Sequence, residues 1–385
     1  MRLISVGLFF LLPLVFASPG DDLFIFDDCK FQCEQITCKN NHYYVNKILD
    51  FHVDNTHVEF GGEPYYPQWR FTNMPLPWYL QLLQWDCELN CDYQCQHHIT
   101  KFVLDEGKEV LQFHGKWPFR RVLGAQEFAS VVFSIGNFIP HYSGFRKVLK
   151  ARHNTNSSAF NNVLLLALVT MAAWIALTIF HYRDTIITER TDYFLAGGTV
   201  LCGFYTITHR VFKLYLPEAR NKSRLLSAAC LLVYVGHVTK LILDWLYTYN
   251  MQANIFVAIL QNLVWCMLCF QLYLKYYQLE HSEPLEHNKN HLPFINFKRI
   301  ILPSFYARSA KTYSLYPLFL GAIVIIGMSL EIFDFAPIFY FVDAHALWHL
   351  VTIIPATYGL YDWLIWDISV NVIPELEEAE LKKLE

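Results

Sequence analysis

The chain has 385 residues, of which 54% are hydrophobic, 17% aromatic and 17% charged. This composition is too apolar for an ordinary soluble globular protein, and the long uncharged runs are typical of membrane spans. The formal net charge is −4 and no basic stripe is present, which excludes an electrostatic case for nucleic acid as a partner. We therefore predict an all-α membrane protein.

The N-terminus has the pattern of a cleavable signal peptide. Residues 1–17 carry a single basic residue, Arg2, followed by an apolar core and by small residues at Ala17-Ser18. The apolar core is short and a polar, cysteine-bearing region follows it, so a membrane span is the weaker interpretation. A signal peptide predicts that the next segment enters the lumen of the secretory pathway, where disulfides can form.

Residues 18–123 are predicted to form a cysteine-rich lumenal domain, because no apolar run in them is long enough to cross a bilayer. The six cysteines fall in two clusters, Cys29, Cys33 and Cys38, and then Cys87, Cys91 and Cys95. The second cluster would line one face of a helix and could be joined to the first by three disulfides, for which fifteen pairings are open. A zinc knuckle is the alternative, and an oxidising lumen disfavours it.

Seven candidate membrane spans follow, and they predict a seven-transmembrane helix bundle over residues 124–367. They lie at about 127–145, 161–182, 192–214, 225–247, 252–275, 314–335 and 338–366. The first span is the weakest, because Asn137, Pro140 and His141 interrupt its apolar run.

The charges of the connections between the candidate spans indicate which side of the membrane each connection faces. Every second connection is basic: Arg146, Lys147, Lys150 and Arg152 after span one, Arg220, Lys222 and Arg224 after span three, and Lys289, Lys298, Arg299, Arg308 and Lys311 after span five. By the positive-inside rule these three connections are cytosolic, which also places the C-terminal tail, residues 368–385, in the cytosol. That tail ends with Lys382 and Lys383 at the fourth and third positions from its end. Lysines at these positions form a dilysine retrieval signal, which predicts a cytosolic retrieval coat as a partner.

Two histidines in the last span point to a metal site. His345 and His349 are four residues apart, so both imidazoles leave one face of a helix, and ionisable groups at membrane depth usually face the bundle interior. For these two alone, metal binding and hydrogen bonding between helices are equally good interpretations. The predicted topology also brings His181, at the end of span two, and Asp192, at the start of span three, to the same lumenal half of the membrane.

Three neutral imidazoles with an open position are typical of a catalytic zinc site, whose bound water can approach a pKa of about 7. Asp192 would then deprotonate that water or hold a histidine in its tautomer. Asp343, Glu331 and Asp334 are further acids near the same end. For these three acids, helix capping and solvation at the membrane interface are at least as good an interpretation.

The order His181, Asp192, His345-x3-His349 resembles the CREST superfamily of membrane hydrolases, which contains alkaline ceramidases and adiponectin-receptor-type enzymes. Further details resemble one branch of it, the post-GPI-attachment-to-proteins factor 3 family. These details are the six lumenal cysteines, the segment Phe113-His114-Gly115-Lys116-Trp117-Pro118-Phe119, Leu330-Glu331 with Asp334-Phe335, and Asp343-Ala344-His345. The resemblance covers nearly the whole mature chain.

This resemblance implies hydrolysis of the sn-2 acyl ester of a GPI anchor, a reaction of the phospholipase A2 type. It implies Zn²⁺ held by His181, His345 and His349, with GPI-anchored proteins and membrane lipid as partners, in the membranes of the endoplasmic reticulum and Golgi. The superfamily has a serine one helical turn before the first histidine, where this chain has Leu177. Thr178 is the neighbouring hydroxyl, although it points about 100° away around the helix; Thr178 and Asp343 are our candidates for supporting the ligands. The alternative is an inactive relative that serves as a lipid-binding or GPI-protein maturation factor.

Overall fold

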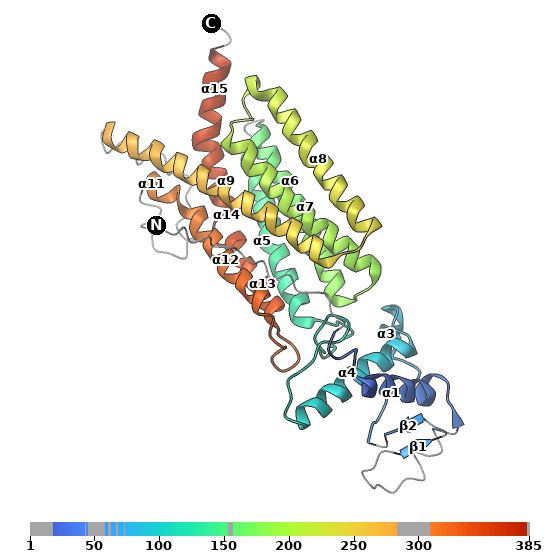
Figure 1. The fold of residues 1–385 in the computed structure, drawn as a ribbon. Helices are drawn as coiled ribbons and strands as arrows, with labels where there is room; N and C mark the ends of the chain where they lie inside the picture. The colour runs from blue at the N-terminus through green and yellow to red at the C-terminus, as the bar shows by residue number, and fades with distance from the viewer. Residues whose placement is uncertain are drawn as a thin grey trace, which may run out of the picture. The chain divides into compact units, whose positions relative to one another are not determined.

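A computed structural model describes residues 18–42, 44, 58–60, 63–66, 68–72, 74–152, 157–282 and 309–382 of the chain. The predicted signal peptide lies outside these residues. The chain divides into two compact units (Figure 1). Unit 1 is Met1–Glu127 with Phe335–Asp343, and unit 2 is Phe128–Asp334 with Ala344–Glu385.

Unit 1 is built around two helices that carry the six cysteines. Its elements are α1 (Phe24–Cys33), the π-helix η1 (Glu34–Cys38), the antiparallel pair β1 (Val58–Phe60) and β2 (Glu63–Tyr65), α3 (Trp78–Leu82) and α4 (Cys87–Asp105). Helix α4 begins where it does because the side chain of Asp86 accepts a hydrogen bond from the backbone N–H of Leu89. Such an N-cap satisfies one of the donors that the first turn of a helix leaves open.

Three disulfides join the two cysteine clusters, as expected. They pair Cys29 with Cys95, Cys33 with Cys91 and Cys38 with Cys87, so the clusters run in opposite directions. Sulfurs of Cys38, Cys87 and Cys91 also lie within 4.8 Å of one another, but each is bonded to a cysteine partner. Because a metal ion needs a thiolate and these sulfurs offer none, the zinc-knuckle alternative is excluded in this structure.

Unit 2 is helical throughout its described residues (Figure 1). Its helices are α5 (Phe128–Arg152), α6 (Ser158–Tyr182), α7 (Ile186–Val211), α8 (Arg220–Leu243), α9 (Tyr247–Ser282), α11 (Ala310–Tyr313), α12 (Tyr316–Phe333), α13 (Ala344–Thr357), α14 (Leu360–Asp367) and α15 (Ile373–Leu381). Two short turns, η2 (Pro217–Ala219) and η5 (Ile368–Val372), precede α8 and α15.

Four helical stretches of the described chain are long and apolar enough to cross a membrane, which confirms a membrane protein. They are Ser158–Tyr182, Pro217–Leu243, Tyr247–Leu279 and Ala310–Phe333. Helices α5 and α7 are as long, with 25 and 26 residues, but are more polar. The count of seven spans therefore stays a prediction.

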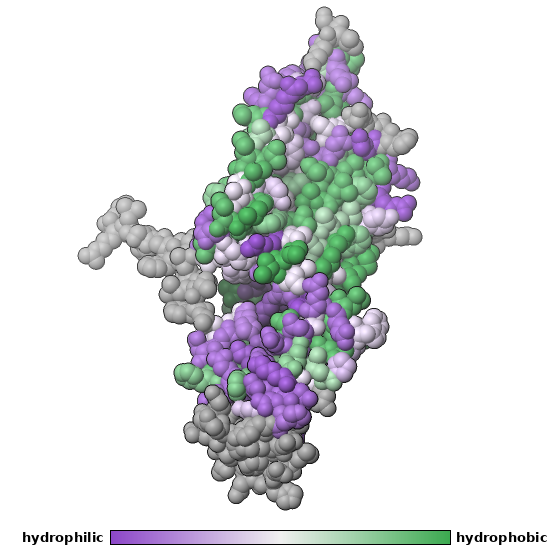
Figure 2. Space-filling model, turned by 90° about the vertical axis from the view of Figure 1, so that its right-hand side faces the viewer, coloured by the Kyte–Doolittle hydropathy of each residue, from purple (hydrophilic) through white to green (hydrophobic). Residues whose placement is uncertain are grey.

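The helices of unit 2 pack in a closed order around an interior. Helix α7 packs against α6, α6 against α5, α5 against α13, α13 against α12, α12 against α9, and α9 against α7 again. Helix α8 packs on α7 outside this ring. On the face of unit 2 turned to the viewer in Figure 2, hydrophobic side chains form a broad band, with hydrophilic ones gathered at the end where α15 lies.

The segment predicted as the last span, 338–366, differs from a single helix in two places. Residues 338–342 form a turn closed by hydrogen bonds between Ile338 and Val342, so the helix begins only at Ala344. It is interrupted again at Gly359, whose φ of +114° favours glycine. The C-terminal residues then continue as η5 and α15, and Ile368 and Val372 are buried.

Candidate metal centre

Three histidines converge inside unit 2, as the sequence predicted. His181 lies in the last turn of α6, and His345 and His349 lie in the first two turns of α13. Their ligand nitrogens are all within 4.8 Å of one another. His181 and His349 are each only 2% exposed, whereas the side chain of His345 is 34% exposed. The cluster is therefore buried on two sides and accessible on the third.

Hydrogen bonds select the tautomers of the two histidines on α13. The Ser134 hydroxyl lies 2.7 Å from the Ser130 carbonyl oxygen and 2.9 Å from Nδ1 of His349. Because the hydroxyl has one hydrogen and donates it to the carbonyl, it accepts from Nδ1–H of His349.

In the same way, a carboxylate oxygen of Glu331 on α12 accepts from Nδ1–H of His345 at 2.7 Å. Both rings thus present the lone pair of Nε2, and these two atoms face each other at 2.9 Å. Two lone pairs at this distance repel each other unless a cation or a proton lies between them. Imidazoles whose Nδ1–H is held by a carboxylate or another oxygen are the usual form of histidine metal ligands. The residues present therefore fit a divalent ion such as Zn²⁺.

Helix α5 holds α13 in place. The side-chain amide of Asn137 donates to the backbone carbonyl of His349 at 2.7 Å, and Nδ1 of His141 pairs with the Tyr361 hydroxyl at 2.7 Å. From α6, the Trp174 ring packs edge-on against His349, with ring centroids 5.5 Å apart. Of the polar residues that weakened the prediction of the first span, Asn137 contacts a histidine of the candidate site, and His141 contacts α14.

The other predicted site residues take different positions. Asp192 is 4% exposed and lies in the second turn of α7, which packs against α6, but it is not part of the three-histidine cluster. The Thr178 hydroxyl donates to the Trp174 carbonyl of its own helix at 2.7 Å. Leu177 is partly buried. Asp343 is buried and is the last residue of unit 1, directly before α13.

Comparison with known proteins identifies the family of this chain. The model of the Per1-like family matches residues 77–368, which include all three histidines and Asp192. The chain belongs to the Per1-like family. No solved structure matches it.

Curated relatives of this Per1-like chain match it over nearly its full length. Protein PER1 of Saccharomyces cerevisiae is 40% identical over 92% of this chain and 94% of its own. GPI-specific phospholipase A2-like PGAP3 is 30% identical in Xenopus tropicalis, over 96% of this chain and 98% of the relative. The protein of the same name in Homo sapiens is 28% identical, over 95% of this chain and 93% of its own. The resemblance found in the sequence is therefore confirmed.

One contributor to the site in this Per1-like chain escaped the sequence analysis. Ser134 is fully buried and lies 215 positions before its partner His349. The available signal was its spacing of three from Asn137 within an otherwise apolar helix, which places both on one face. Glu331 was noticed as an acid near the site, but its contact with His345 could not be read from the spacing.

A cavity of about 1030 Å³ occupies the interior of the helix ring. It is lined mainly by apolar side chains of α6, α7, α9 and α12, with a few amides such as Asn162 and Gln261. On α13 it reaches Trp348 and Thr352, which flank His349 in sequence. Its volume is at the upper end of the roughly 300–1,000 Å³ typical of small-molecule sites.

Proposed function

We propose that this chain is a metal-dependent hydrolase that removes the sn-2 acyl chain from GPI anchors, a phospholipase A2-type reaction. The observation that carries the proposal is the pair of α13 histidines whose Nδ1–H groups are held by Ser134 and Glu331, so that both Nε2 atoms point at one place beside His181. The names of the PGAP3 relatives support the substrate and the reaction class.

His181, His345 and His349 would hold the ion. A zinc ion bound there supplies a Lewis acid and lowers the pKa of a coordinated water. Ser134 and Glu331 keep the Nε2 lone pairs available and orient the two rings. The Asp192 carboxylate would take up the proton of the attacking water and return it to the leaving alkoxide, which is general acid–base catalysis. Burial of His181 and His349 limits the access of bulk water.

We propose that the apolar cavity receives the acyl chain of the substrate. Its lining is mainly hydrocarbon and includes Trp348 and Thr352, which lie one residue before and three residues after His349 on α13. An ester bond placed beside these two residues would present its carbonyl to the histidine cluster, while the chain extends between α6, α9 and α12. An apolar chain of this kind gains free energy from every methylene it buries.

We further propose seven membrane crossings, made by the four apolar helices together with α5, α7 and the interrupted pair α13–α14. The histidine cluster would then face the lumen of the endoplasmic reticulum and Golgi. The retrieval signal would face a cytosolic coat. Lys382 is exposed, and Lys383 lies outside the described residues.

Metal content and fatty-acid release, measured on one preparation, test the hydrolase. Purified wild-type protein should contain close to one metal ion and should release sn-2 fatty acid from a GPI substrate. Alanine at His181, His345 or His349 should remove most of the metal and nearly all of the release. If wild-type protein binds metal but releases no fatty acid, the hydrolase is refuted, and the inactive lipid-binding or maturation factor suggested by Leu177 replaces it.

A further inference from the structure

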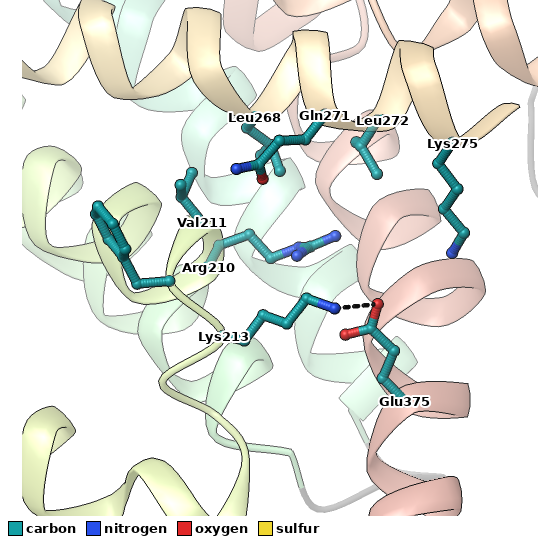
Figure 3. Close-up of a pocket in the computed structure, with 9 residues that line it drawn as sticks. Arg210, Val211, Lys213, Leu268, Gln271, Leu272, Lys275 and Glu375 are labelled. Atoms are coloured by element: carbon teal, nitrogen blue, oxygen red, sulfur yellow. Dashed lines mark ion pairs between the residues drawn. The ribbon is translucent and has the colours of Figure 1, made fainter. Parts of the chain in front are cut away.

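A second pocket lies at the opposite end of the helix ring from the histidines. It has a volume of about 470 Å³ and is lined by the C-terminal end of α7, the C-terminal half of α9, and α15 (Figure 3). Arg210 on its wall follows Asp192 by eighteen residues of the same helix, a distance of about 27 Å along the axis. The pocket is therefore distant from the candidate metal centre, although its wall residues Arg210 and Leu268 also line the apolar cavity.

Three cations line this pocket, and within the described part of the chain one of them has no carboxylate at ion-pairing distance. Figure 3 shows Arg210 of α7, Lys213 of the connection after α7 and Lys275 of α9 extending into the same space. Arg210 is bound by both oxygens of Asp367, at 2.6 and 2.9 Å, and Lys213 lies 3.1 Å from Glu375.

Among the described residues, Lys275 donates to a neutral acceptor, the Asn371 amide oxygen, at 2.9 Å. That oxygen also accepts from the Tyr276 hydroxyl at 2.8 Å. An ammonium group has three donors, so most of the hydrogen-bonding capacity of Lys275 is left for a ligand. The lining thus carries one positive charge that the protein does not neutralise.

The floor of the pocket is apolar. Leu268 and Leu272 of α9 are 1% and 4% exposed and line the space on the α9 side of Arg210 and Lys213, and Val211 of α7 also lines it. Figure 3 also shows the Gln271 amide directed into the same space. A ligand that fits this lining has an anionic head and a hydrocarbon part next to it.

Further basic residues lie on α8 and α11, which pack against α7 and α9, whereas α15 carries Glu375, Glu377, Glu378 and Glu380. The first turn of α8 carries Arg220, Lys222 and Arg224, and α11 carries Lys311. These residues belong to the connections that the positive-inside rule assigns to the cytosol, where anionic lipids are enriched. Basic pockets between membrane helices on that side are a recurrent form of lipid head-group site.

We infer that this pocket binds the phosphate of an anionic phospholipid. Lys275 and Lys213 contact the phosphate, Arg210 stays paired with Asp367 at the inner wall, and Leu268 and Leu272 pack against the first carbons of the acyl chains. Free phosphate shares the head-group chemistry but gains nothing from the apolar floor, which favours the lipid as the occupant.

The test uses the full chain, purified in a zwitterionic detergent and stripped of lipid. Native mass spectrometry measures binding of dioctanoyl phosphatidylinositol and of dioctanoyl phosphatidylcholine. Phosphatidylinositol should bind with the higher affinity. Lys275→Gln should lower that affinity about fivefold, the usual effect of one lysine at an anionic membrane surface, and Lys275→Arg should largely preserve it. Millimolar inorganic phosphate should not displace the lipid.

Lys240→Gln is the matched control, because Lys240 lies on α8 at the other end of the bundle and pairs with Asp244. If Lys275→Gln does not fold, Lys213→Gln carries the test, since the Lys213 side chain is 53% exposed. Equal affinities for the two lipids would overturn the inference, as would equal effects of the pocket variants and Lys240→Gln. Displacement of the lipid by inorganic phosphate would also overturn it and identify a simple phosphate site.

Discussion

Ser134→Ala is the sharpest test of how the histidine cluster is held. The hydroxyl of Ser134 accepts from Nδ1–H of His349, and both residues are at most 2% exposed. Without it, a buried N–H is left with no acceptor, which costs about 1–3 kcal/mol. The ring can avoid this cost by rotating or by moving its proton to Nε2, and either change removes a ligand from the cluster. Metal affinity should therefore fall about 10–100-fold, as is usual for an outer partner of a ligand.

The assay is competition with a chelator of known affinity, followed by metal analysis of the protein. Ser130→Ala is the matched control. Ser130 is one turn away on α5 and 1% exposed, and among the described residues its hydroxyl has no hydrogen-bond partner. Its backbone carbonyl still accepts from Ser134 in the variant. Unchanged metal affinity in Ser134→Ala would refute the reasoning, and so would an equal loss in both variants.

Four further results are expected. Asp192→Asn should keep its metal while sn-2 release falls about 10²–10⁴-fold in the same assay, because the ligands remain but proton transfer fails. Hydrogen bonding to Asp92 raises the pKa of His114 above its ordinary value of about 6.5. The contribution of protonated His114 to the stability of unit 1 is therefore complete below about pH 6.5 and is lost as the pH rises through the raised pKa. Thermal unfolding at a series of pH values should show this loss, and His114→Gln should abolish it. Alkylation of unreduced, denatured protein, read by mass spectrometry, should label none of the six cysteines of unit 1, whose bridges each stabilise by about 2–4 kcal/mol. Asn221 is exposed in an Asn-Lys-Ser sequon but faces the cytosol in the proposed topology, so glycosidase treatment should produce no mass shift there.

The convergence of the histidines could be predicted because it depends on two regular patterns in the sequence, the helical repeat and the alternation of basic connections. The spacing of four places His345 and His349 on one helix face, and alternation of basic connections along the chain brings His181 to the same end. The disulfide pairing was not available from the sequence, because it depends on α1 and α4 running in opposite directions. The same limit applies to Ser134, whose partner is determined by which helices are neighbours in the ring.

The interruption of the last predicted span has a local cause that hydropathy does not report. Residues 338–342 are apolar enough to extend a span, yet they close into a turn, with positive φ at Phe339 and Tyr340. The prediction treated 338–366 as one span because it rests on the number of apolar residues, which carries no information about the backbone dihedral angles. The consequence is functional, since the histidines then fall in the first two turns of α13, close to its N-terminal end.

Helix α5 shows why a helix that contacts the candidate site has a low mean hydropathy for a membrane span. A polar group in hydrocarbon is costly unless it is satisfied internally, and two polar side chains of α5 have such partners: Ser134 with His349, and His141 with Tyr361. Its exposed hydrophobic residues lie in a different stripe, at Val132, Ile135, Ile139, Tyr142 and Leu149. One face therefore meets protein and the other is suited to lipid. A mean hydropathy averages the two faces, so the helix that supports the candidate site scores below the helices that mainly face lipid.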